Sequence, residues 1–116
     1  MITHWEEQAP EAPFYAVIFI SKKSRELEGY QEADESLMAE ARQQAGYLGY
    51  SSLGREDEGI FISYWRDKSS IEQWRAHGDH LVAKANGRKK WYDYYHSMIC
   101  RVESSRVFQK EISRLL

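Results

Sequence analysis

The sequence predicts a single α+β domain built on an antiparallel sheet, and three observations support this prediction. The chain has 116 residues, which is the usual size of one domain. Hydrophobic residues make up 42% of it and charged residues 29%, a balance typical of a globular protein with a packed core. Segments with strand-like and helix-like hydrophobic patterns follow one another in the order β–α–β–β–α–β.

The first strand and the first helix differ in their hydrophobic patterns. Residues 14–20 are apolar on both faces and rich in β-branched and aromatic side chains, which predicts a central strand covered on both sides. An apolar stripe at spacings of three and four residues then predicts a helix of about twenty residues that ends at Gly46. The stripe consists of Leu27, Tyr30, Ala33, Leu37 and Ala41.

Two further strands and a second helical region occupy the middle of the chain. Residues 47–53 and 60–65 are predicted strands, joined as a hairpin by a turn at 54–59. Ser69 and Glu72 have the spacing of a capping box, which predicts the start of a helix. We expect Gly78 to break or bend this helix, with a second segment running as far as Trp91.

The last strand is predicted at residues 94–103, where side chains alternate between two faces. The face expected to join the core carries Tyr94, His96, Met98, Cys100 and Val102. The chain therefore divides into a polar lead-in at 1–13 with Trp5 as a candidate anchor, a folded domain at 14–104, and a tail at 105–116. The spacing of apolar residues in the tail predicts a short helix.

The predicted element order is that of the ferredoxin-like fold, in which helices cover only one face of an antiparallel sheet. The strand at residues 14–20 is apolar on both faces, so the face without helices must also be covered. We therefore expect a homodimer in which two sheets face each other.

Charge and composition argue against several classes of protein. The net charge is −2, whereas nucleic-acid-binding domains are usually basic, so no nucleic acid is expected as a partner. The longest apolar run, residues 14–20, is much shorter than the roughly 20 residues that cross a membrane. The N-terminus lacks the features of a signal peptide, and Cys100 is the single cysteine, so a cytoplasmic location is expected.

Several short motifs resemble those of a known family. They are Gly-Tyr-Leu-Gly-Tyr at 46–50, Ile-Ser-Tyr-Trp at 62–65, Ile-Glu-Gln-Trp-Arg-Ala-His at 71–77, Trp-Tyr at 91–92 and Cys-Arg-Val-Glu at 100–103. With them, residues 14–104 are similar to the antibiotic biosynthesis monooxygenase (ABM) family. The resemblance implies a dimeric α/β barrel, in which two ferredoxin-like subunits pack sheet to sheet and each holds a cavity.

Members of that family differ in their chemistry. Some oxidise aromatic polyketides or quinols with dioxygen and without metal or flavin, and others bind and degrade haem. The haem-degrading branch has an axial histidine about ten residues after the position of Trp74, where this chain has Lys84. It also has an asparagine in the first strand, and residues 14–20 contain none.

The leading functional prediction is therefore a cofactor-independent monooxygenase-like protein that acts on an aromatic or quinone-type molecule. A haem- or tetrapyrrole-binding dimer is one alternative. A non-catalytic dimer that binds a small hydrophobic or aromatic ligand is the other.

Trp74 and His77 are the predicted catalytic residues. They are three positions apart, so in a helix they share a face, where His77 could act as a general base beside an aromatic wall. Trp65, His80, Trp91 and Tyr95 are predicted to line the ligand pocket, and ordinary core packing is the alternative for these rings. No third ligand accompanies His77 and His80 at a useful spacing, so no metal site is expected. The sequence also lacks a Gly-rich phosphate loop and the nicotinamide and flavin motifs, so no cofactor is expected.

Overall fold

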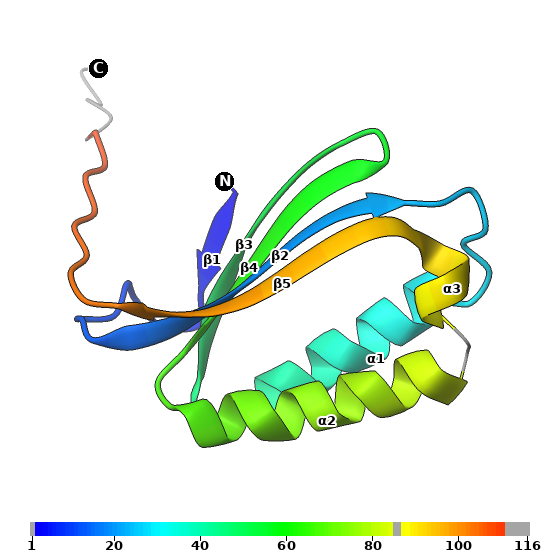
Figure 1. The fold of residues 1–116 in the computed structure, drawn as a ribbon. Coiled ribbons are helices and arrows are strands. Elements are labelled where there is room, and N and C mark those ends of the chain that lie inside the picture. The colour runs from blue at the N-terminus through cyan, green and yellow to red at the C-terminus, as the bar shows by residue number, and fades with distance from the viewer. Residues whose placement is uncertain (1, 85–86, 111–116) are drawn as a thin grey trace, which may run out of the picture.

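A computed structural model describes residues 2–84 and 87–110 (Figure 1). These residues form five strands, β1 (Thr3–Trp5), β2 (Phe14–Lys23), β3 (Tyr47–Arg55), β4 (Glu58–Trp65) and β5 (Tyr92–Val102). The helices are α1 (Tyr30–Gln43), α2 (Lys68–Lys84) and the short α3 (Gly87–Trp91). The sheet has the strand order β1-β3-β4-β2-β5, and all neighbouring strands are antiparallel.

This arrangement confirms the predicted ferredoxin-like α+β fold and adds one strand, β1, at an edge. Helices α1 and α2 lie side by side beneath one face of the sheet, and no described helix covers the other face (Figure 1). Strand β2 is central, because Ile18 lies opposite Ile62 of β4 and opposite Met98 of β5. None of the described helices is both long and apolar enough to span a membrane.

The hydrophobic core lies between the two long helices and the sheet. Trp65 is fully buried, and its ring lies 5.0 Å from that of Trp74 between centroids. The Trp65 indole N–H donates to Ser63 Oγ at 2.8 Å, and the Trp74 indole N–H donates to the Leu37 carbonyl at 2.9 Å. These bonds let two large rings be buried without unpaired donors. The remaining buried residues of this cluster are Val17, Ala41, Tyr47 and Ile71.

Helix α2 differs from its prediction at its start and at Gly78. Asp67 caps the helix, since the Ser70 N–H and the Ser69 hydroxyl both donate to Asp67 Oδ1 at 2.8 Å. These bonds hold the pKa of the Asp67 carboxyl below its usual value. The helix then continues through Gly78, so the predicted break is wrong. A Cβ there would lie 2.9 Å from Leu37 Cδ1, so glycine at this position allows α1 and α2 to pack closely.

The face of β5 that meets the helices is the opposite of the predicted one. Ile99 lies opposite the core residue Val17, so the odd-numbered residues 95–101 face the helices. The residues predicted to join the core instead lie on the face without helices; they are Tyr94, His96, Met98, Cys100 and Val102. Because β2 is apolar on both faces, the pattern alone could not decide which face the helices cover.

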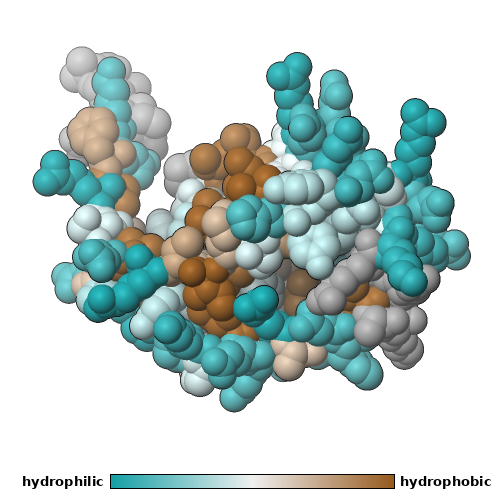
Figure 2. Space-filling model, in the orientation of Figure 1, coloured by the Kyte–Doolittle hydropathy of each residue, from teal (hydrophilic) through white to brown (hydrophobic). Residues whose placement is uncertain are grey.

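The face of the sheet without helices, the open face, is also apolar. Alternate residues of the three strands β4, β2 and β5 point to this face; among them are Ala16, Ile18, Ile20, Ile62, Met98 and Cys100. Figure 2 shows an apolar patch over the upper side of the sheet, beside the polar side chains at the end of the β3–β4 hairpin. The sheet thus has two apolar faces, and the described helices cover one of them.

The N-terminal segment is attached to the sheet through β1, which pairs with β3. The Trp5 ring packs on Tyr64 with centroids 4.7 Å apart, so Trp5 does anchor the segment. Gly49 makes this pairing possible, because a Cβ there would overlap the carbonyl oxygen of His4. Its φ of 153° is also one that other residues rarely adopt.

The C-terminal segment, residues 103–110, belongs to no helix or strand, although the sequence predicted a helix from residue 105. It leaves the sheet on the side opposite to the helices (Figure 1). Its apolar residues Val107 and Phe108 are 62% and 86% exposed. The rest of the predicted helix, residues 111–116, lies outside the described residues.

Candidate functional site

A partly open cavity of about 590 Å³ lies between the sheet and the two long helices. The sheet contributes Phe19, Phe61 and Tyr95 to its lining, and the helices contribute Met38 and Trp74. Small-molecule sites have volumes in this range and combine apolar walls with a few polar groups. The cavity is therefore the candidate functional site.

One end of the cavity, which we call the aromatic end, is formed by Phe19, Tyr30, Tyr92 and Tyr95. The rings of Phe19 and Tyr95 stack with centroids 5.5 Å apart, and Tyr92 meets them edge-on at 5.4 and 5.6 Å. Tyr30 of α1 meets Tyr92 at 6.1 Å. A register shift between β2 and β5 places Tyr92 and Tyr95 on the same face, which strict alternation would not do.

Two opposite charges, Lys23 and Asp34, line the cavity beside the aromatic end. The Lys23 Nζ lies 4.8 Å from the centroid of the Tyr30 ring, in a cation–π contact. Asp34 lies on α1 and lines the cavity, and its side chain is exposed. The surrounding protein nevertheless removes water from its carboxyl and raises its pKa; Lys23 opposes this shift and Glu35 adds to it.

The Tyr92 phenol is held in its neutral form. Burial raises its pKa, and the nearby Tyr30 phenol, which is hydrogen-bonded to it, and the Asp34 carboxylate raise the pKa further. A neutral phenol can donate a hydrogen bond at neutral pH. The aromatic end therefore offers a carboxylate, an ammonium group and a neutral phenol to a ligand.

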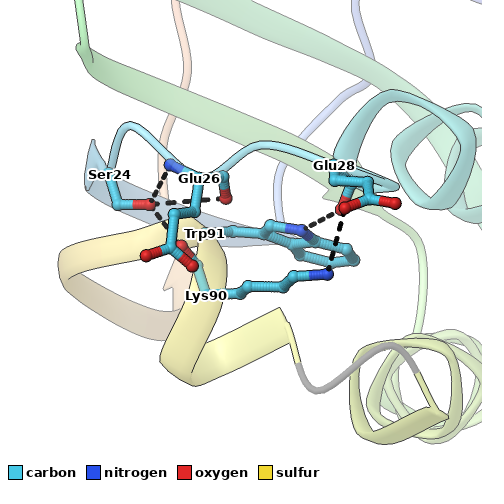
Figure 3. Close-up of polar contacts among 5 residues, drawn as sticks. All are labelled: Ser24, Glu26, Glu28, Lys90 and Trp91. Carbon is cyan, nitrogen blue, oxygen red and sulfur yellow. Dashed lines mark hydrogen bonds and ion pairs between the residues drawn. The ribbon is translucent and has the colours of Figure 1, made fainter.

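The short helix α3 holds the aromatic end in place (Figure 3). The buried Trp91 donates its indole N–H to the Glu28 carbonyl at 2.8 Å, and its ring meets Tyr30 at 5.6 Å. The Ser24 hydroxyl donates to the Lys90 carbonyl, and the Ser24 backbone N–H donates to the Trp91 carbonyl at 2.7 Å. The Lys90 ammonium also lies 3.9 Å from the Glu28 carboxylate. Trp91 thus packs against Tyr30 and holds it at the aromatic end.

The four predicted aromatic site residues divide into two groups. Trp74 and Tyr95 line the cavity. Trp65 and Trp91 are 0% and 2% exposed and lie in the structure around it. Their indole N–H groups are already used within the protein.

The two predicted histidines are not part of the cavity lining. His80 is exposed. The Nε2 of His77 is buried, and no described residue offers it a hydrogen bond. The side of α2 that lines the cavity includes Trp74, Gly78 and Val82, at a spacing of four residues rather than three. A catalytic role for His77 stays a prediction.

The described residues contain no group of three His, Cys, Asp or Glu side chains that could hold a metal ion. The position ten residues after Trp74 is Lys84, the last residue of α2, whose side chain lies outside the described part of the chain.

Lys23 and Asp34 are not among the site residues predicted from the sequence. One signal was present for Asp34, which comes four residues after Tyr30 and so lies at the edge of the predicted apolar stripe. Lys23 lies beyond the predicted end of the first strand. It could have been found by extending the alternation Val17, Phe19 and onward to residue 23.

The fold and the cavity define a class of protein, the ferredoxin-like subunit with a cavity between its sheet and helices. Residues 13–86, more than half of the chain, match the family described as antibiotic biosynthesis monooxygenase. The chain belongs to this family, which confirms the resemblance seen in the sequence.

Two relatives and two solved structures illustrate these similarities. The uncharacterized protein YqjZ of Bacillus subtilis is 41% identical over 104 residues, which cover 89% of this chain and 91% of that protein. The jasmonate monooxygenase ABM of Pyricularia oryzae is 30% identical over 105 residues, which cover 87% of this chain and 48% of that protein. This chain thus spans about half the length of the fungal protein.

SnoaB, a cofactor-independent oxygenase from Streptomyces nogalater, has a similar structure with a TM-score of 0.60 and 13% identity. The match covers 85% of this chain and 100% of SnoaB. Protein SO0527 from Shewanella oneidensis matches with a TM-score of 0.64 and 11% identity, over 89% of this chain and 99% of that one. At these identities the structural matches show a shared fold.

Proposed function

We propose that this protein is a cofactor-independent monooxygenase-like protein that acts on an aromatic or quinone-type small molecule. The observation that carries the proposal is a cavity of about 590 Å³ with aromatic walls in a member of this family. Flat aromatic ligands stack favourably on such rings. The names of the fungal relative and of SnoaB, both oxygenases, support the same class of reaction.

The proposed reaction begins when a phenolic hydroxyl of the substrate loses its proton to a group of the protein. The anion then gives one electron to dioxygen, and the two radicals join at the carbon para to the hydroxyl. Loss of water from this hydroperoxide leaves a quinone. One oxygen atom stays in the product and the other leaves as water, so no external reductant is needed.

Two residues are candidates for the proton acceptor. His77, predicted from the sequence, has a buried and unpartnered Nε2 in the described structure but lies outside the cavity lining. Asp34 lines the cavity. Loss of a general base lowers turnover by roughly 10²–10⁴-fold, so His77→Ala and Asp34→Asn, measured side by side, distinguish the two.

We also propose that the protein forms a homodimer in the cytoplasm through the open faces of two sheets. The support is the apolar surface that includes Ile18, Ile62 and Met98, which no described helix covers. Large apolar patches of this kind mark interaction surfaces. A lone cysteine such as Cys100 fits a reducing compartment.

The reaction is tested with 1-naphthol, dioxygen carrying an oxygen label, and a chelator that removes adventitious metal. We expect oxygen uptake above the rate without protein and one labelled oxygen atom in the naphthoquinone product. Trp74→Ala removes part of the aromatic wall and should abolish the uptake. Binding of 1-naphthol without any uptake would contradict the proposal and would indicate a binding protein.

A further inference from the structure

Lys23 and Asp34 are both placed to meet a ligand. They approach the aromatic end from different elements, Lys23 from the end of β2 and Asp34 from the second turn of α1. Within the described part of the chain, neither side chain forms an ion pair, so their charges are not cancelled by direct contact. The Tyr30 ring holds the Lys23 ammonium at this end, with Nζ 4.8 Å from the ring centroid.

We propose that Lys23 and Asp34 form an acid–base end of the cavity, and that the ligand carries an ionisable hydroxyl on an aromatic or quinone-type ring. The inference rests on the proposed function, because it names the groups that receive the reactive hydroxyl of the same ligand. The hydroxyl O–H bond breaks, its electron pair stays on the ligand oxygen, and the proton moves to an Asp34 carboxylate oxygen. The Lys23 ammonium then stabilises the oxyanion.

The groups around Asp34 suit this role. Partial loss of hydration raises the pKa of Asp34, which makes its carboxylate a better proton acceptor than one in water. Lys23 from β2 lowers that pKa and Glu35 on the same helix raises it. Among the described residues of the aromatic end, the remaining titratable groups are the phenols of Tyr30, Tyr92 and Tyr95. Tyr92 stays neutral, so it adds no negative charge beside the oxyanion.

The proposal is tested with 4-nitrophenol and, as a matched probe, 4-nitroanisole, in which a methyl group replaces the hydroxyl proton. Equilibrium dialysis gives the affinities, and the visible spectrum of bound nitrophenol shows whether it is ionised. We expect nitrophenol to bind the wild-type protein at least about 10-fold more tightly than nitroanisole, and in its ionised form.

The pH dependence identifies Asp34 as the proton acceptor. In the wild-type complex the probe is ionised and its proton is on Asp34. Once free nitrophenol is ionised, binding must take up a proton, so affinity falls about tenfold per pH unit. In Asp34→Asn the probe binds as the anion beside Lys23 alone, so its affinity rises with pH and then levels off. Lys23→Met should return the bound probe to its neutral form.

Glu35→Gln is the control, because Glu35 is an exposed neighbour of Asp34 that does not line the cavity. Removing its charge lowers the Asp34 pKa but leaves the proton acceptor in place, so the affinity should still fall about tenfold per pH unit. A neutral bound probe, or the same pH profile in Asp34→Asn and the wild type, would overturn the proposal. Failure of both probes to bind would overturn it together with the proposed ligand class. Ionised binding without oxidation of 1-naphthol would uphold the acid–base end and contradict the monooxygenase.

Discussion

Three tryptophans next to the cavity use their indole N–H groups within the protein. Trp65, Trp74 and Trp91 are all buried, and each donates to an acceptor of the protein itself. A ligand therefore meets Trp74 as ring surface only. Polar contacts must come from other groups, and Lys23 and Asp34 are placed to provide them.

Two substitutions at Trp74 separate its packing from its hydrogen bond. Trp74→Ala should lower the free energy of unfolding by about 3–5 kcal/mol and abolish binding of nitrophenol, because it removes a buried ring and part of the wall. Trp74→Phe should cost less and retain binding, since a flat ring remains. Urea unfolding and dialysis measure the two effects. Retained binding in the alanine variant would contradict a wall at this position.

The Asp67 N-cap of α2 makes the free energy of unfolding fall as the pH is lowered into the acid range. The folded-state pKa of Asp67 lies below its ordinary 3.8, so the cap stabilises the protein fully above that value. Its contribution is lost as pH falls through the folded-state pKa. Asp67→Ala should therefore cost about 1 kcal/mol at neutral pH and almost nothing in strong acid. Urea unfolding at several pH values measures this, with Ser69→Ala as the control for the weaker side-chain bond.

At the scale of elements, the types and order of the main helices and strands from β2 to β5 could be predicted because hydrophobic periods of two and 3.6 residues are local properties, whereas β1 was not predicted. The face of β5 that meets the helices could not be predicted, since β2 is apolar on both sides. The register shift that brings Tyr92 beside Tyr95 depends on pairing with another strand. The site could be predicted only in part for the same reason. Trp74 lies in a local helical pattern, whereas Asp34 and Lys23 come from different elements that only the fold brings together.

The close pairing of β1 with β3 at Gly49 can be tested by substitution. Gly49→Ala should lower the free energy of unfolding by about 1–3 kcal/mol, because the new methyl group meets the His4 carbonyl and the backbone conformation is unfavourable for alanine. Gly54→Ala, in the same strand, is the matched control. The added carbon there lies 3.5 Å from its nearest neighbour, the Glu58 carbonyl oxygen, so it should cost much less. Equal losses in the two variants would contradict the proposed cause.

At the scale of the whole molecule, the open face and the C-terminal segment lie on the same side of the sheet (Figure 1). Val107 and Phe108 of that segment are exposed, as is Ile60 on the open face. Stable protein interfaces bury about 800 Å² on each partner. In the proposed homodimer, a second sheet packed on the open face would lie beside this segment and shelter both apolar surfaces.

Adjacent residues of β5 offer a matched test of the homodimer. Met98→Lys places a charge on the open face and should give a monomer at micromolar concentration in sedimentation experiments. Ile99→Lys places the same charge one residue further, on the opposite face, where the side chain is 41% exposed. This control should remain a dimer. A dimer in both variants would show that the open face is not the interface.

The added strand β1 also bears on whether the sheet can pair with strands of other molecules at high protein concentration. It fills the border of β3, where the Ser52 N–H donates to the Ile2 carbonyl at 2.9 Å and the Glu6 N–H donates to the Leu48 carbonyl at 3.0 Å. A bare sheet border recruits strands from other molecules and starts fibrous growth. These few residues thus occupy the border of β3, while β5 forms the other border of the described sheet. Proteolytic removal of them would leave the folded body with a border on which fibres can grow.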